Sequence, residues 1–403
     1  MRFVPEAERV SFTPDAPQAP PANRIVVAIG LVLAVALVWV VARTAGPIMA
    51  GTSALGLALG FTLFHSRFGF TSGWRQLAAV GQGAAVRAHM LMLATATISL
   101  AGTPKPSVAA VGIPLLVGAF LFGIGMQVGG SCASGTLFAV GSGQTAVVLT
   151  LFGFIVGSVL AALTFTFWTV TVPAGTPISL AETFGYPGAL GLSLLVMATI
   201  VAITYVVARR RTPPPVERPP SARGIARVLR GSWPMWVGAI VLAVLNAGVL
   251  FVSGGAWGVT SAFGLWGGKV LSGLGVDVAS WAYFQVPANA KALQGSVFAD
   301  RISVLDFGVI VGALVASALG GAFVLHKRVP WKLALGSVLG GIAMGYGARL
   351  AGGCNIGAYF SGIASFSLHG WIWGVVALGG TFVGLRLRPL FGLTNPKPSD
   401  SIC

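Results

Sequence analysis

The stretch QVGGSCASGTLFAVGSG, residues 127–143, decides the fold, because its pattern returns in RLAGGCNIGAYFSGIAS, residues 349–365. When Cys132 is aligned with Cys354, Gln127 falls on Arg349 and Phe138 on Phe360. Five glycines also recur, with Gly118, Gly123, Gly125, Gly130 and Gly135 matching Gly340, Gly345, Gly347, Gly352 and Gly357. A weaker echo links GFTSGW, residues 69–74, with GVTSAF, residues 258–263. The sequence therefore predicts two related halves.

Composition places the chain in a membrane. Of its 403 residues, 55% are hydrophobic and only 8% are charged, against about a quarter charged in soluble domains. The mean hydropathy is +0.87. Apolar runs of about 20 residues, the length that crosses a bilayer as a helix, recur along the chain. These features predict an all-α polytopic membrane protein, and the net charge of +16 is attributed to basic loops rather than to nucleic-acid binding.

The apolar runs predict ten spanning helices and four shorter half-helices that enter the membrane and turn back. The half-helices are expected near 69–80, 132–141, 258–273 and 354–366. The expected spans are 25–42, 47–64, 86–101, 108–130, 145–168, 188–208, 235–253, 304–325, 333–351 and 370–386.

The distribution of Lys and Arg predicts the orientation, because basic residues are enriched in cytoplasmic loops. With the N-terminus inside, few basic residues face outward, namely Arg43, Lys105, Lys269, Lys291 and Arg301. The expected organisation has an N-terminal cytoplasmic tail, a first half, a basic Pro-rich cytoplasmic linker, a second half and a C-terminal cytoplasmic tail. Their bounds are 1–24, 25–208, 209–232, 233–386 and 387–403. The linker is interpreted as a solvated connection or, alternatively, as a docking surface for a soluble partner.

The same alternation sends 108–130 inward and 333–351 outward. The halves are therefore predicted to be inverted repeats related by a pseudo-two-fold axis, an architecture in which broken helices meet near the bilayer midplane of transporters. The second half is longer, mostly through residues 276–303.

The two Gly-Cys motifs are predicted to bind an anion. Each marks a sharp turn whose freed backbone groups need a partner, and the helix that follows directs its N–H groups toward the turn. Neither motif contains a carboxylate. The candidate substrate-binding residues are Cys132, Cys354, Gly130, Ser131, Ser134, Gly135, Gly353, Asn355, Gly357, Arg349, Gln127, Thr71, Ser72, Thr260 and Ser261.

Several of these residues keep two interpretations. Cys132 and Cys354 are either small core residues or paired thiols that pass a sulfur-containing anion through S–H···S contacts. Arg349 either attracts the anion or holds its turn by binding carbonyls, with Gln127 as its neutral counterpart. His369 and the tryptophans are expected at the membrane interface. The sequence has no nucleotide-binding motif and no metal-ligand spacing, so no cofactor, metal or ATP use is expected.

The motifs GIGMQVGGSCASGTLF and GYGARLAGGCNIGAYFSGIASFSLHGW resemble the paired signatures of the YeeE/YedE family of bacterial inner-membrane proteins, also called the sulfur-transport family. The resemblance covers most of residues 47–386. It implies thiosulfate uptake through an hourglass-shaped protein in which cysteines relay the anion, and Cys132 and Cys354 match the two central ones. It also implies a small cytoplasmic sulfur-carrier partner of the TusA or rhodanese type.

One departure from the family pattern concerns the first half-helix. Some thiosulfate-transporting members have a further cysteine there, whereas SRFGFTSGWRQL, residues 66–77, has none, and Thr71 and Ser72 are the candidate substitutes. The expected function is transport of thiosulfate or a related anion into the cytoplasm, without enzymatic activity. The alternatives are transport of another sulfur or selenium species, and a membrane thiol oxidoreductase that uses Cys132 and Cys354.

Overall fold

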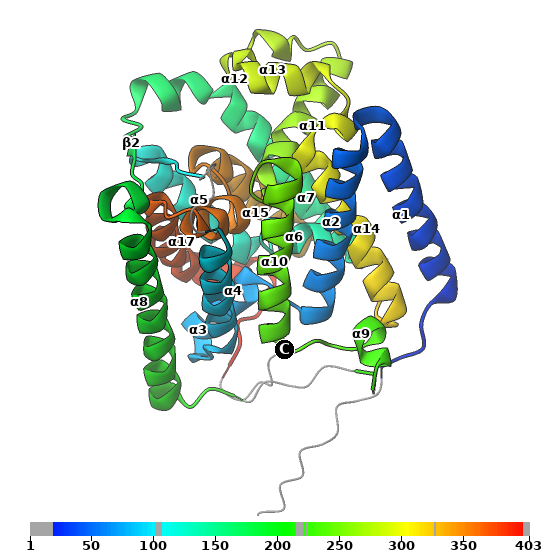
Figure 1. Cartoon of the computed structure of the whole chain (residues 1–403), viewed down its shortest axis with the longest axis vertical. Coiled ribbons are helices and arrows are strands. Elements are labelled where there is room, and N and C mark those ends of the chain that lie inside the picture. The colour runs from blue at the N-terminus through cyan, green and yellow to red at the C-terminus, as the bar shows by residue number, and fades with distance from the viewer. Residues whose placement is uncertain (1–18, 101–106, 215–220, 223, 326–327, 398–403) are drawn as a thin grey trace, which may run out of the picture.

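The computed structural model describes residues 19–100, 107–214, 221–222, 224–325 and 328–397 of the chain, and these are almost entirely helical (Figure 1). Nine helical stretches among them are long and apolar enough to cross a membrane. The all-α polytopic membrane prediction is thereby confirmed. The one other predicted span, 86–101, forms the shorter helix α4, Ala84–Leu100. At about 1.5 Å per residue, its 17 residues give only about 25 Å of helix.

The long helices lie close to the predicted spans. They are α1 (Arg24–Ala45), α2 (Pro47–Ser66), α5 (Ile113–Val128), α7 (Thr145–Leu163), α8 (Leu180–Arg211), α10 (Met235–Ser253), α14 (Arg301–Leu319), α15 (Trp331–Leu350) and α17 (Leu368–Leu387). Helix α8 is broken at Gly185, whose φ is 69°, and this break explains why the sequence pattern placed the start of the span at 188.

Each predicted half-helix is present as a short helix. They are α3 (Phe70–Val80), α6 (Ala133–Gly141), α11 (Thr260–Gly273), and the π-helical turn η4 (Asn355–Phe360) that continues into α16 (Ser361–Ala364). The remaining elements are β1 (Ala110–Val111), β2 (Thr176–Pro177), η1 (Phe167–Thr171), α9 (Ala226–Arg230), η2 (Val278–Ser280), α12 (Ala282–Gln285), α13 (Pro287–Gln294), η3 (Val297–Ala299) and η5 (Arg388–Phe391). The two short strands pair with each other in antiparallel fashion.

Helices α5 and α15 cross at the centre of the molecule through glycines. Gly118 lies against the carbonyl of Gly347, and Gly125 lies against the carbonyl of Gly340. Each contact becomes the other when the halves are exchanged, because Gly118 matches Gly340 and Gly125 matches Gly347 in the repeat. Small residues are what allow two helix backbones to approach this closely in a membrane.

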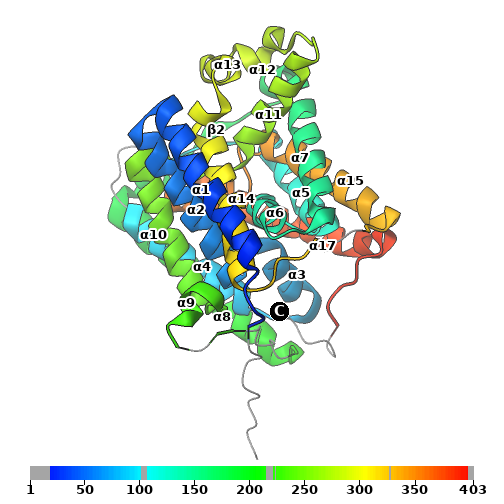
Figure 2. The same ribbon diagram turned by 90° about the vertical axis from the view of Figure 1, so that its right-hand side faces the viewer.

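Other helix pairs exchange in the same way. In the repeat, α2 matches α10, α4 matches α14, α5 matches α15 and α7 matches α17. The contact of α2 with α14 therefore corresponds to that of α10 with α4, and the contact of α15 with α7 to that of α5 with α17. The views agree: α1, α2 and α14 lie on one flank, with α5, α7 and α15 on the other (Figure 2). These contacts are those that the predicted repeat requires, and its inversion across the membrane stays a prediction.

The helix ends define two ends of the molecule. At one end, here called the basic end, Arg230 of α9 reaches the carbonyls of Leu319 and Pro20, and Arg211 of α8 reaches Ala78 of α3. At the opposite end, here called the loop end, α12 and α13 form a cap (Figure 1). These two helices come from the extra segment of the second half.

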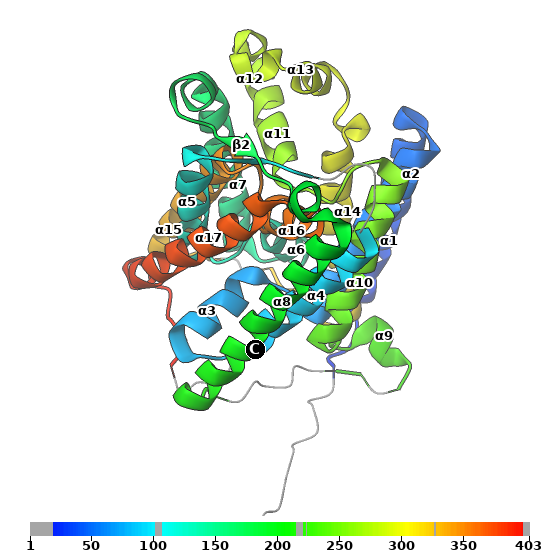
Figure 3. The ribbon, with the colours of Figure 1, turned by 60° about the vertical axis from the view of Figure 1, so that its left-hand side comes forward.

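The outer elements cover the repeat unevenly. Helices α1 and α8 lie on opposite outer sides (Figure 1), and α8 runs alongside α3 and α4 (Figure 3). Most of their side chains remain exposed, as expected for surfaces that face lipid.

The crossing of α5 and α15 yields a test of packing. We expect Gly347→Ala to lower the stability of the folded protein by about 1–3 kcal/mol, the usual cost of overpacking, because the new methyl group would meet the carbonyl of Gly118. The measurement is the thermal unfolding midpoint in detergent. Gly379→Ala in α17 is the matched control, since nothing lies within 4 Å of that position. Equal midpoints for the two variants would show that the crossing tolerates expansion.

Candidate functional site

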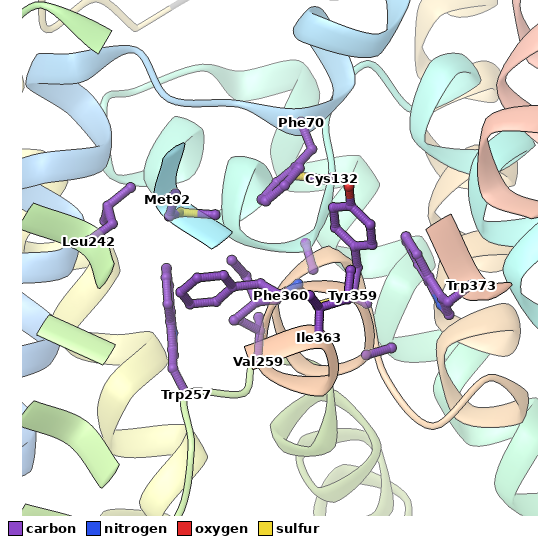
Figure 4. Close-up of a cluster of buried hydrophobic side chains, with 14 of the residues drawn as sticks. Phe70, Met92, Cys132, Leu242, Trp257, Val259, Tyr359, Phe360, Ile363 and Trp373 are labelled. Atoms are coloured by element: carbon purple, nitrogen blue, oxygen red, sulfur yellow. Dashed lines mark hydrogen bonds between the residues drawn. The ribbon is translucent and has the colours of Figure 1, made fainter. Parts of the chain in front are cut away.

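The four half-helices begin at one buried cluster in the centre of the protein. Phe70 is the first residue of α3, Cys132 caps α6, Val259 caps α11 and Cys354 caps η4. All four belong to the same hydrophobic core cluster, where the ring of Phe70 lies 6.0 Å from that of Tyr359 (Figure 4). From this centre α3 and α6 run toward the basic end, and α11 and α16 run toward the loop end.

Glycine backbone conformations form the two turns. Gly130 has a φ of 82° and its repeat partner Gly352 a φ of 66°, both in the left-handed region that only glycine adopts readily. The next residue, Gly353, has a φ of 145°. The repeat seen in the sequence is therefore also a repeat of conformation, and the turns place a cysteine at the start of each half-helix.

Both thiols are free and enclosed at equivalent places. The exposed fractions of Cys132 and Cys354 are 1% and 0%. The sulfur of Cys354 accepts from the backbone N–H of Ile356 at 3.4 Å, and the sulfur of Cys132 lies 3.7 Å from the hydroxyl of Ser134. Each thiol thus points over the first turn of its own half-helix.

Polar groups beside the turns differ in whether they have partners. The hydroxyls of Ser131 and Thr136 are 2.8 Å apart, and Ser361 donates to the carbonyl of Trp257. By contrast, the amide side chain of Asn355 is buried and neither its nitrogen nor its oxygen has a hydrogen-bond partner among the described residues. An unpartnered buried amide is costly, so the side chain of Asn355 is available to form hydrogen bonds with a ligand.

The helix ends at the centre contribute positive partial charge. No acidic residue occupies the first turn of α3, α6, α11 or η4. The N-terminus of a helix presents free N–H groups and a partial positive charge of about half an elementary charge. Four such ends around one cluster favour an anion over a cation.

A cavity of about 380 Å³ approaches this centre from the loop end. Its lining includes the predicted residues Thr260, Ser261, Arg349, Gly353 and Gly357. Neither thiol lines it, but Gly353 and Gly357 flank Cys354 in the chain, so Cys354 lies directly behind the cavity wall. Arg349 also lines a second cavity of about 230 Å³, together with His369 and Trp168.

The arginines of the larger cavity have different partners. Arg349 donates to the hydroxyls of Tyr283 and Thr260, at 2.6 and 3.4 Å, and its Nε has no partner among the described residues. Arg301 instead donates to the carbonyls of Gly255 and Ala256 at 2.9 and 2.8 Å. Arg349 thus binds hydroxyls, whereas Arg301 binds carbonyls of the loop before α11. Each terminal nitrogen of the Arg349 guanidinium carries two N–H bonds and has one partner here, so Arg349 keeps donor capacity beside the cavity.

The other predicted residues form a separate group. Gln127 donates to the carbonyl of Thr71 at 3.2 Å, while Ser72 donates to the carbonyl of Gly69. Gln127 and Arg349 each contact the Thr-Ser half-helix of their own half, so they occupy equivalent places without lying together. The hydroxyl of Thr71 and the side-chain oxygen of Gln127 are buried without partners among the described residues.

Several expectations from the sequence were wrong in detail. His369 is buried rather than interfacial, and its Nε2 lies 2.8 Å from the carbonyl oxygen of Ala351, where it supports the second turn. Trp257 and Trp373 are core residues with 1% and 0% exposure, not interfacial ones. Cys403 lies outside the described residues. Local sequence cannot separate a buried ring from an interfacial one, because both follow apolar runs.

The sequence reasoning also passed over two charged residues. Arg388 is buried at the end of α17 and donates to the carbonyl of Gln127 at 2.7 Å. Asp306 is fully buried in α14. An acid inside an apolar run was a visible signal, whereas the position of Arg388 just after a predicted span gave none.

Comparison with known proteins identifies the family. The family model described as "Sulphur transport" matches residues 65–383. The chain belongs to the sulphur transport family. It is 27% identical over 335 residues to the thiosulfate transporter TsuA of Escherichia coli (strain K12), covering 79% of this chain and 88% of that protein. A thiosulfate transporter TsuA of Spirochaeta thermophila is also 27% identical, covering 79% and 92%.

A further relative matches over a shorter region. The "Probable transporter YedE" of Escherichia coli (strain K12) is 33% identical over 167 residues, which is 40% of this chain and 41% of that protein. The predicted family is confirmed, and with its apolar helices the chain is a multi-pass membrane protein of a transport family.

The free donor capacity of Arg349 predicts its effect on anion binding. We expect a small anion, with thiosulfate as the probe, to raise the thermal unfolding midpoint of the purified wild-type protein, because a ligand that binds only the folded state stabilises it. Arg349→Gln should weaken binding by about tenfold or more, since a hydrogen bond to a charged group contributes about 1.5–3 kcal/mol. The control is Lys291→Gln, an exposed cation of α13. The same thiosulfate dependence in Arg349→Gln and wild type would remove Arg349 from the site.

Proposed function

We propose that this protein transports thiosulfate, or a closely related sulfur-containing anion, into the bacterial cytoplasm, and that it is a transporter rather than an enzyme. The observation that carries the proposal is the pair of enclosed thiols, Cys132 and Cys354, at the start of two half-helices that contact each other. Membership of the sulphur transport family and the names of the TsuA relatives support the choice of substrate.

The route is proposed to begin in the cavity at the loop end. Arg349 draws the anion in, and Ser261 and Thr260 offer hydroxyls along its wall. The anion then passes between Cys354 and Cys132, where a neutral S–H is a weak donor to sulfur and oxygen. The unpartnered amide of Asn355 supplies the stronger hydrogen bond beside the first thiol.

Beyond the thiols, the route continues to the first half-helix. No cysteine stands there, and the buried hydroxyl of Thr71, which has no partner among the described residues, takes that place. A hydroxyl is a better donor than a thiol, so this step can handle the oxygen end of the anion. Arg388, next to Gln127, marks the exit at the basic end.

The location is proposed to be the inner membrane, with both termini and the basic end in the cytoplasm. Arginines of α8 and α9 gather at that end, as the positive-inside rule requires. This orientation sets an energetic problem. Each negative charge moved inward costs about 2.3 kcal/mol per 100 mV of membrane potential, so consumption of the anion in the cytoplasm or ion coupling must drive uptake.

Uptake by whole cells tests the thiol route. In cells without their own sulfate and thiosulfate importers, we expect the wild type to take up radiolabelled thiosulfate. Cys132→Ala and Cys354→Ala should each abolish uptake, because each removes a donor from an enclosed passage. Cys403→Ala is the matched control, since it removes the one remaining cysteine of the sequence.

All variants are compared at equal membrane expression. Uptake that survives both substitutions would make the cysteines packing residues. A double Cys→Ser variant that still transports would exclude a redox reaction between them. No uptake by the wild type would refute thiosulfate as the substrate and direct the search to other sulfur or selenium anions.

A cytoplasmic partner is proposed at the basic end. A small TusA-like or rhodanese-like sulfur-carrier protein would remove the anion or its sulfur there and so offset the opposing potential. Arg209 and Arg210 of α8 are exposed at this end and available for docking. The region between α8 and α10 lies partly outside the described residues.

Docking can be separated from transport by two assays. We expect the double variant Arg209→Gln, Arg210→Gln to take up less thiosulfate in cells, where the carrier is present, but to match wild type in proteoliposomes, where it is absent. Lys291→Gln, at the loop end, should behave as wild type in both. Undiminished cellular uptake by the double variant would contradict docking at these arginines.

A further inference from the structure

Asp306 of α14 is a charged group that the transport route does not use. Among the described residues it is the only fully buried carboxylic acid, and neither of its oxygens has a hydrogen-bond partner there. An ionised carboxylate in such a place loses its hydration without compensation. Acidic groups at membrane depth are rare and serve ion or proton pathways.

Its position on the helix directs Asp306 toward the centre. Ile302, one turn before it, lines the cavity that contains Arg349. Two turns after it, the side chain of Ala313 lies against Gly141 of α6. Since residues four and seven apart share a face of a helix, Asp306 lies on the face that runs from the cavity to the half-helix that Cys132 caps.

The other faces of α14 are already occupied. Leu305 and Val309 pack against glycines of α2, and Phe307 stacks on Trp266 of α11 with ring centroids 5.1 Å apart. Trp266 also donates to Ser303 at 2.9 Å. Asp306 is thus fixed by packing on both sides while its own polar atoms stay unused.

From these contacts we propose that Asp306 carries a proton that is transported together with the anion. The inference rests on the proposed function and adds its coupling ion. A protonated carboxyl group is neutral and offers one donor to an anion nearby, whereas an ionised one repels that anion. Binding of the anion and of the proton therefore favour each other, as linkage requires.

Coupling to a proton also addresses the opposing membrane potential. A proton that enters with the anion cancels one negative charge of the moving complex. Asp306 releases this proton once the anion has left and water reaches the carboxyl group from the basic end. Both species then move inward, and the carboxylate must be protonated again from the loop end.

The nearby charged groups are engaged elsewhere. Asp300 caps α14 by accepting from Ser303, and Arg301 binds carbonyls of the loop before α11. The other elements packed against α14 also carry titratable or charged groups: Arg24 and Arg43 at the ends of α1, His65 of α2, Arg227 and Arg230 of α9, and Lys269 of α11. Lys269 donates to the carbonyls of Leu293 and Gly295. The half-helices add the thiols of Cys132 and Cys354.

Reconstituted full-length protein tests the proposal. Proteoliposomes contain a pH-sensitive dye, and potassium with valinomycin holds the membrane potential at zero so that an anion current alone cannot draw protons in. Thiosulfate is added outside, and uptake of the radiolabel and internal pH are followed together. For wild type we expect internal acidification with uptake, and several-fold faster uptake when the outside is made acidic.

The variant Asp306→Asn has the same shape but no titrating group. We expect it to let thiosulfate move down its own gradient without acidification and without stimulation by outside acid. Asp306→Glu, which keeps a carboxyl group, should retain both signals at reduced rate. Asp300→Asn is the matched control, since it changes an acid that only caps the helix, and it should behave as wild type.

The outcomes separate the two proposals. If wild type takes up no thiosulfate, the proposed function fails. If wild type takes up thiosulfate without acidification and without a response to outside acid, proton coupling is overturned while transport stands. Uptake that requires sodium ions and ignores pH would overturn the proton in favour of a metal cation. Acid stimulation that persists in Asp306→Asn would place the proton on another group.

Discussion

The approach of α5 to α15 through facing glycines determines where the rest of the molecule can lie. Each helix runs directly into one Gly-Cys turn, and Gly118 meets Gly347 while Gly125 meets Gly340, so this antiparallel crossing fixes where both turns begin, one at each end of the contact. A larger residue at the crossing would separate the halves and, with them, Cys132 and Cys354. The position of the chemistry is thus set by residues that have no side chain.

The turns create a second constraint. A bilayer offers no water to unpaired backbone groups, yet four half-helices end inside the protein. Their N–H groups face inward at one enclosed cluster, with thiols and one amide beside them. The fold thereby concentrates partial positive charge at its centre without placing a lysine or arginine there. An anion bound by such groups is held by many weak donors rather than by one strong ion pair, and can leave again.

Much of this arrangement could be predicted from the sequence because it depends on local patterns. Glycine next to cysteine, repeated in register, indicated both turns, and the apolar run lengths separated spanning helices from half-helices. The sequence could not show which distant groups meet. The pairing of Arg349 with Tyr283 depends on α12 in the extra segment, and that of Gln127 with Arg388 on the end of α17. His369 and Trp373 look interfacial by composition, but His369 is buried against the carbonyl of Ala351, and Trp373 among the rings of Trp74, Phe122 and Tyr359.

The exchange of matching contacts between the halves has a consequence for direction. An inverted repeat, as predicted for this chain, has a backbone that offers no preference between inward and outward passage. The preference must come from the few positions where the halves differ in charge. Arg349 stands where the other half has Gln127, and α14 carries Asp306 whereas α4, the matching helix of the other half, has no acidic residue. The preferred direction of transport is therefore determined by a few charged side chains on an otherwise apolar fold. A small number of substitutions at these positions would be enough to create, remove or reverse that preference.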